Sequence, residues 1–153
     1  MADLQTANTA TLTIRRVIAA PAERIFRAWT DPAQLKSWFT PSEDVTVVST
    51  DIDARVGGSY RITFLGKQKI PFSVSGDYRR VQPFETLAFT WTWEDSDMDV
   101  GETLVTLQLT EQGDSTELVL THELLPAGDK RDEHEHGWNA ILDSFAVYAA
   151  KPE

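Results

Sequence analysis

The pattern of apolar and polar residues divides the chain into one strand, two short helices, a long run of strands and a final helix. Leu12, Ile14 and the Val17–Ile18 pair mark a first strand, which Pro21 ends. Apolar residues at helical spacing then predict one short helix after Pro21 and a second after Asp31, where an Asp-Pro pair is typical of a helix start.

From residue 45 onward the period changes to two, which is typical of strands with one buried face. The residues that share the inward phase are Tyr60, Ile62, Phe64, Ile70, Phe72, Val74, Tyr78, Leu87, Phe89, Trp91, Trp93, Val105, Leu107, Leu109, Leu118, Leu120 and His122. The gaps between these runs carry turn residues and are too short for crossover helices, so we predict an antiparallel sheet.

A last helix is predicted over residues 129–150, after Pro126 and Gly128. Five of its residues lie close to one face: His134, Trp138, Ile141, Phe145 and Tyr148. Because an apolar sheet face needs a cover, we predict an α+β fold in which six or seven antiparallel strands curve around this helix. The two short helices, between strands 1 and 2, would close one end.

The length of 153 residues fits one domain, which we place at residues 11–150 after a flexible N-terminus at residues 1–10. The first ten residues have no basic segment followed by an apolar one, and no eighteen apolar residues run together. These observations predict a cytoplasmic protein without membrane insertion.

The net charge of −10 disfavours nucleic acid and anionic membranes as partners. The charge is uneven, because residues 94–153 carry 15 acids and 3 bases. A solvated face explains this best, and a basic protein partner is the alternative. The absence of cysteine excludes disulfides, thiolate nucleophiles and cysteine-bound zinc.

Four motifs together carry a resemblance: residues 20–32 (APAERIFRAWTDP), Trp38-Phe39, residues 57–60 (GGSY) and Gly137-Trp138. Over residues 11–150 the chain resembles homologues of the C-terminal domain of the heat-shock-protein ATPase activator, within the START / Bet v 1-like (SRPBCC) superfamily. The resemblance implies a helix-grip fold. It also implies a cavity between sheet and C-terminal helix, which the superfamily uses for lipids, polyketides and other apolar ligands.

The candidate ligand-binding residues are the aromatic and polar side chains expected between the sheet and the last helix. They are Trp38, Tyr60, Phe64, Phe72, Phe89, Trp91, Trp93, His122, His134, Gly137, Trp138, Ile141 and Phe145. Close packing of these residues into an ordinary core is the alternative to a cavity.

Three of these positions raise separate questions. His122 shares the inward phase, so its ring nitrogens bind either a ligand or protein groups such as Tyr60, and we favour the second. His134 is expected near the cavity mouth. Gly137 costs the helix about 1 kcal/mol relative to alanine, which indicates close approach of a sheet side chain or a ligand, and we favour the side chain.

The sequence predicts no metal and no cofactor. In residues 133–136 (EHEH) the histidines are two apart, whereas helical metal ligands stand three or four apart. The acidic run 94–99 lacks the glycine and terminal glutamate of a calcium loop and is interpreted as a solvated hairpin loop.

We expect a binding protein that holds a hydrophobic small molecule, lipid or polyketide-like, under the last helix. Two alternatives remain open. One is a co-chaperone-like domain that binds a protein through its acidic outer face. The other is a cyclase-like enzyme on a reactive apolar substrate, with His122 or His134 as acid or base.

Overall fold

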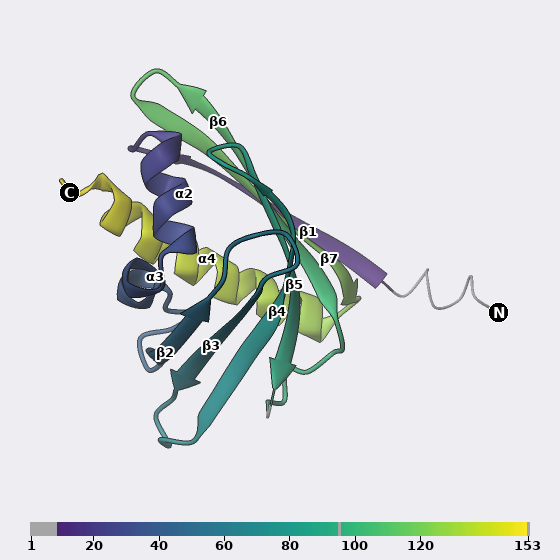
Figure 1. Ribbon diagram of the computed structural model, residues 1–153. Helices are drawn as coiled ribbons and strands as arrows, with labels where there is room; N and C mark the ends of the chain where they lie inside the picture. The colour runs from purple at the N-terminus through teal and green to yellow at the C-terminus, as the bar shows by residue number, and fades with distance from the viewer. Residues whose placement is uncertain (1–8, 95, 153) are drawn as a thin grey trace.

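The computed structural model describes residues 9–94 and 96–152, which form an antiparallel sheet curved around the C-terminal helix (Figure 1). The elements are β1 (Thr9–Ile18), α2 (Ala22–Thr30), α3 (Pro32–Trp38), β2 (Thr46–Ile52), β3 (Ser59–Leu65), β4 (Pro71–Gln82), β5 (Thr86–Glu94), β6 (Thr103–Gln112), β7 (Ser115–Pro126) and α4 (Asp129–Ala150). The seven strands are ordered β1-β7-β6-β5-β4-β3-β2. The predicted helix-grip fold is therefore confirmed, with seven strands.

Most predicted boundaries agree with the structure, and α4 has the predicted bounds. β1 begins at Thr9, inside the segment 1–10 that was expected to be flexible, while residues 1–8 lie outside the described part of the chain. Ile70 was predicted to face inward but is 65% exposed, because it lies in the turn before β4 and not in the strand.

The two short helices begin at the predicted signals. The carboxylate of Asp31 accepts a hydrogen bond from the Ala33 backbone amide at 2.9 Å, and Pro32 occupies the first turn of α3. Pro21 was expected to be the first helical residue but is the N-cap residue of α2, which begins at Ala22. Both helices lie beside α4 at one end of the curved sheet (Figure 1).

The position of α4 is fixed at its end and near its middle by arginines from other elements. The guanidinium of Arg24, on α2, donates to three backbone carbonyls at the C-terminal end of α4, those of Tyr148, Ala149 and the C-cap residue Lys151. These carbonyls have no partner within a helix, and a cation there also complements the helix dipole. On β1, Arg16 donates to the carboxylate of Asp143 at 2.7 Å. None of the helices described is long and apolar enough to cross a membrane.

A glycine lets one tyrosine reach across the sheet. Tyr60 on β3 stands opposite Gly76 on β4, and its hydroxyl donates to the Thr90 carbonyl of β5 at 2.5 Å. A β-carbon at Gly76 would lie 2.0 Å from that same carbonyl oxygen. The tyrosine therefore bridges two strands only because the position between them carries no side chain.

We expect Gly76→Ala to destabilise the fold, because the new methyl group forces the β4–β5 pair apart or displaces Tyr60. The loss should be about 1–3 kcal/mol or more in the free energy of unfolding, measured by urea denaturation. Gly66→Ala is the matched control, since its β-carbon would meet only Phe72 at 3.8 Å. Equal stability of the two variants would contradict the close approach at Gly76.

Candidate ligand-binding pocket

A pocket of about 240 Å³ lies between the sheet and the first half of α4. Its inner wall is formed by buried side chains, which are Phe39, Phe64, Trp91, Trp93, His134, Trp138 and Ile141. Partly or fully exposed residues surround its mouth, namely Pro41, Phe72, Met98, Glu133, His136 and Gly137. The lining is predominantly aromatic, which is typical of sites for small apolar molecules.

The structure brings most of the predicted site residues to this pocket. Those on its wall are Phe64, Phe72, Trp91, Trp93, His134, Gly137, Trp138 and Ile141. Tyr60 and Phe89 instead line a separate void of about 20 Å³, which is large enough for one water molecule. Trp38, His122 and Phe145 line neither space and are buried in the core.

Sequence reasoning missed five lining residues: Phe39, Pro41, Met98, Glu133 and His136. A signal for two of them was present, because Glu133, His136 and Gly137 follow the helical spacing of three and four that places residues on one face. Glu133 was expected on a solvated face, and its side chain is exposed as expected. It also borders the pocket, which was not expected.

His122, on β7, uses both ring nitrogens within the protein. The Trp138 indole donates to Nδ1 at 3.0 Å, so the ring proton resides on Nε2. The Thr103 hydroxyl donates to the Trp91 carbonyl at 2.8 Å, so its oxygen accepts from Nε2 at 2.7 Å. The favoured interpretation, a histidine bound by protein groups, holds, although Trp138 and Thr103 take the place suggested for Tyr60.

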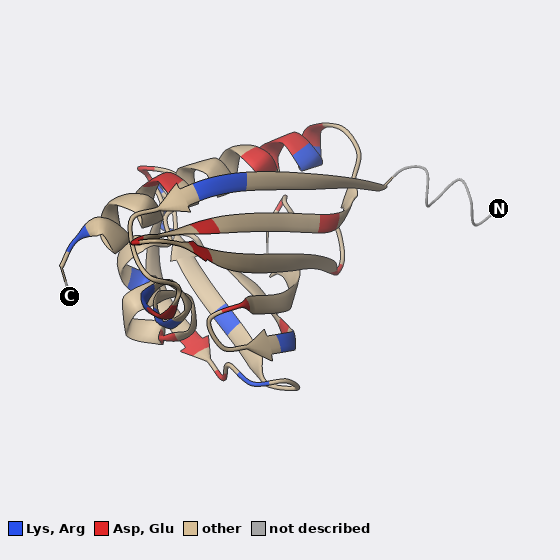
Figure 2. Cartoon of the chain, turned by 90° about the horizontal axis from the view of Figure 1, so that it is seen from above, with Lys and Arg blue, Asp and Glu red and all other residues tan. Residues whose placement is uncertain are grey.

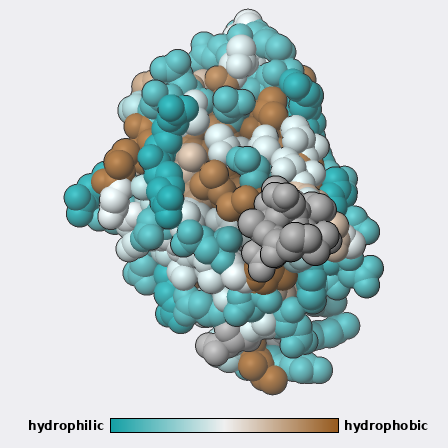
Figure 3. Space-filling model, turned by 90° about the vertical axis from the view of Figure 1, so that its right-hand side faces the viewer, coloured by the Kyte–Doolittle hydropathy of each residue, from teal (hydrophilic) through white to brown (hydrophobic). Residues whose placement is uncertain are grey.

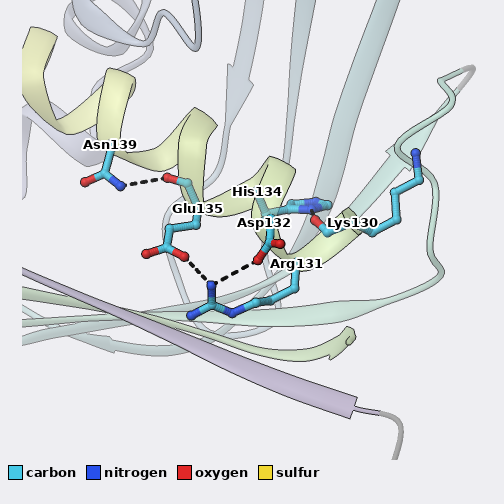
Figure 4. Close-up of polar contacts among 6 residues, drawn as sticks. All are labelled: Lys130, Arg131, Asp132, His134, Glu135 and Asn139. Carbon is cyan, nitrogen blue, oxygen red and sulfur yellow. Dashed lines mark hydrogen bonds and ion pairs between the residues drawn. The ribbon is translucent and has the colours of Figure 1, made fainter. Parts of the chain in front are cut away.

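His134, on α4, is bound in the opposite tautomer. Its Nδ1 donates to the Lys130 carbonyl at 2.6 Å, one turn earlier in the helix (Figure 4). Its Nε2 accepts a hydrogen bond from the Trp93 indole of β5 at 3.0 Å. The ring borders the pocket, yet neither nitrogen has a hydrogen-bonding site left for a ligand.

Both histidines are held in the neutral form. Burial lowers the pKa of His122 to about 3, with a further lowering from His134, whose ring centre lies 5.2 Å away. Burial also lowers the pKa of His134. Because each ring is neutral and fully hydrogen-bonded, neither is arranged to exchange a proton with a bound molecule. The titratable groups left on the pocket are Glu133 and His136, at its mouth.

Gly137 leaves the helix surface open at the pocket. A β-carbon built there would find no atom nearer than the Pro41 β-carbon at 4.0 Å. The expected contact with a bulky sheet side chain is therefore wrong, because the sheet does not approach this face of the helix. The space beside Gly137 belongs to the pocket.

Two indole groups are the buried side-chain donors without a partner in the described part of the chain. They are the Nε1 atoms of Trp29 and Trp91. Both residues line the void of about 20 Å³. No three or more acidic or histidine side chains gather in metal-binding geometry among the residues described.

This fold, with a pocket enclosed between a curved sheet and its C-terminal helix, defines a helix-grip protein of the START / Bet v 1-like superfamily. Residues 19–150 match the model of one family within it, described as activator of Hsp90 ATPase homolog 1-like protein. The chain belongs to this family. No match was found among curated proteins.

Solved structures with the same fold span nearly the whole chain. A protein from Chromobacterium violaceum is 28% identical, with a TM-score of 0.84 over 93% of this chain and 98% of that one. The AHSA1 protein from Silicibacter pomeroyi is 30% identical, with a TM-score of 0.76 over 92% and 98%. An AHSA1-like protein from Aeromonas hydrophila, 24% identical, has a TM-score of 0.77 over 91% of each chain and supports the fold alone.

We expect Gly137→Ala to stabilise the protein. The new methyl group meets no atom closer than 4.0 Å, so the variant gains helix propensity without a clash. The free energy of unfolding should rise by about 0.8–1 kcal/mol in urea denaturation. A loss of stability would show that something packs against this face of α4 after all.

Stability should fall as the pH is lowered below about 6.5, the ordinary histidine pKa, which applies in the unfolded chain. Because burial lowers the folded pKa of His122 to about 3, the unfolded state binds more protons in this range and is favoured. His134 adds to the effect in the same direction.

The slope should approach about 1.4 kcal/mol per pH unit for His122, and His134 should make it steeper. Urea denaturation at a series of pH values from 7.5 to 5.0 measures it, above the range where most carboxylates titrate. His122→Gln should give a shallower slope than the wild type, whatever its absolute stability. An unchanged slope would rule out the buried neutral state of His122.

Proposed function

We propose that this chain binds a small hydrophobic molecule in the pocket beneath the first half of α4. The observation that carries the proposal is Gly137, a helical position that forgoes about 1 kcal/mol of propensity beside open space. A helix selected for stability alone would carry alanine there. The aromatic wall and the family membership support the same conclusion.

The size of the pocket supports a compact ligand. Its volume of about 240 Å³ is below the roughly 300–1,000 Å³ of sites for drug-sized molecules. A body of one or two rings, or a short chain, suits this space better than a lipid with two acyl chains. A small polyketide-like ring system fits the same description.

Activation of a chaperone ATPase, which the family description suggests, is the alternative. The exposed large apolar residues Val17, Val48, Val56, Ile70, Phe84, Leu124 and Val147 come from different elements. On the face drawn in Figure 3, apolar side chains occur in several separate groups among hydrophilic ones. Protein interfaces have a contiguous apolar centre, and these scattered residues do not form one. We therefore favour a small molecule in the pocket over a protein partner.

Calorimetric titration with naphthalen-2-ylmethanol, a neutral two-ring alcohol, tests the proposal. We expect saturable binding to the wild type. Gly137→Leu should abolish it, because the longer side chain extends into the pocket while the helix is retained. Val147→Leu, at an exposed position of the same helix, is the control and should bind as the wild type does. Absence of binding to the wild type, or equal binding to Gly137→Leu, would refute this function.

A further inference from the structure

The pocket wall offers a ligand aromatic surface and few hydrogen bonds. The indole donors of Trp93 and Trp138 are used by the two histidines, and both nitrogens of His134 are occupied. The Trp91 indole nitrogen is buried out of reach. A molecule in the pocket therefore meets ring faces and edges, with Met98 and Ile141 beside them.

The mouth of the pocket is acidic. Glu133 and His136 are the polar exposed side chains of the lining, and none of the described lining residues is a lysine or arginine. Lys130 pairs with the Glu133 carboxylate at 3.3 Å, although Lys130 itself does not line the pocket. The lining therefore contributes one carboxylate and neither lysine nor arginine, and Lys130 shares that carboxylate from outside the pocket.

The other basic side chains nearby pair with acids that do not line the pocket. Arg131 lies between the carboxylates of Asp132 and Glu135 (Figure 4). Lys67 borders an adjoining depression together with Asp97, and it pairs with Asp44 at 3.6 Å. Figure 2 shows acidic residues at the N-terminal end of α4, which borders the pocket. An anionic head group at this mouth would meet the Glu133 carboxylate and would find neither lysine nor arginine in the described lining.

Aromatic rings attract cations, because the face of each ring carries negative charge density. A pocket lined by six aromatic rings with a carboxylate at its opening combines the two features that recognise an organic ammonium group. The six are Phe39, Phe64, Phe72, Trp91, Trp93 and Trp138. A cation at the mouth keeps part of its hydration, so it avoids the full cost of burial.

We propose that the ligand is a small organic cation, with an apolar or aromatic body inside the pocket and a protonated or alkylated amine beside Glu133. This inference rests on the proposed function and adds the chemical class of the ligand. It excludes fatty acids and other molecules with an anionic head. Burial of the apolar body provides most of the affinity. The Glu133 carboxylate and the aromatic rings provide the selectivity for a cationic head group.

Three compounds with one body separate the contributions. They are naphthalen-2-ylmethanamine, which is cationic at neutral pH, the neutral alcohol naphthalen-2-ylmethanol, and the anion 2-naphthoate. In calorimetric titrations at pH 7 and low salt we expect the amine to bind about 2- to 5-fold more tightly than the alcohol. The naphthoate should bind more weakly than the alcohol by a similar factor, and 0.5 M salt should shrink both differences.

Glu133→Gln tests the position of the charge. The variant should lose the preference for the amine while its affinity for the alcohol stays within about twofold of the wild type. Glu135→Gln is the control, because it removes the same charge from the same helix at a residue that does not line the pocket. This control should keep the preference.

The outcomes distinguish the two proposals. If the alcohol binds but the naphthoate binds as tightly as the amine, the cation is refuted and the apolar pocket stands. A preference for the amine that survives in Glu133→Gln also overturns the assignment, since the charge is then recognised elsewhere. If none of the three compounds binds, both the proposed function and this inference fail.

Discussion

Two hydrogen bonds between tryptophan and histidine join the helix to the sheet, and the pocket depends on them. In one, the indole of Trp138 on α4 donates to His122 on β7, and in the other the indole of Trp93 on β5 donates to His134 on α4. The helix and the sheet thus each supply one donor and one acceptor. The four residues lie deep in the protein, where an unpaired polar atom would cost about 1–3 kcal/mol.

This exchange also determines the chemistry of the pocket. The indoles of Trp93 and Trp138 and both nitrogens of His134 are bound within the protein, and the Trp91 nitrogen is buried, so the wall is apolar although it contains a histidine and three tryptophans. Neutral imidazoles are required, since each ring has to accept one hydrogen bond from an indole. The same arrangement that holds α4 in place therefore leaves the chemistry of recognition to the residues at the mouth.

The fold could be predicted from the sequence because its signals are local and repeated. The change of apolar period from helical spacing to two, the Asp-Pro helix start and the short turns each restrict the topology, and together they leave one long helix to cover the sheet. Tyr60, by contrast, appeared to be an ordinary inward residue. Its bond to Thr90 depends on a glycine in the neighbouring strand, and strand register is not visible in the sequence.

The candidate site was predictable only in outline. An inward aromatic residue can fill a core, as Trp38 and Phe145 do, or border an open space, as Trp93 does, and the pattern is the same for both. The difference arises from packing between distant elements. Met98 illustrates this, because it belongs to a loop that appeared solvated and nevertheless reaches the pocket. Gly137 was recognised as unusual, but only the structure shows that its neighbour is empty space.

The tryptophans of this protein form one unbroken chain of ring contacts. From α3 to the pocket, the successive centre-to-centre distances are 4.7 Å for Trp38–Trp29, 6.3 Å for Trp29–Trp138, 4.8 Å for Trp138–Trp91 and 5.4 Å for Trp91–Trp93. These are all five tryptophans of the chain. At such separations, electronic excitation of one indole passes readily to the next. The ultraviolet emission of the whole protein is therefore expected to respond to a molecule bound in the pocket, without any added label.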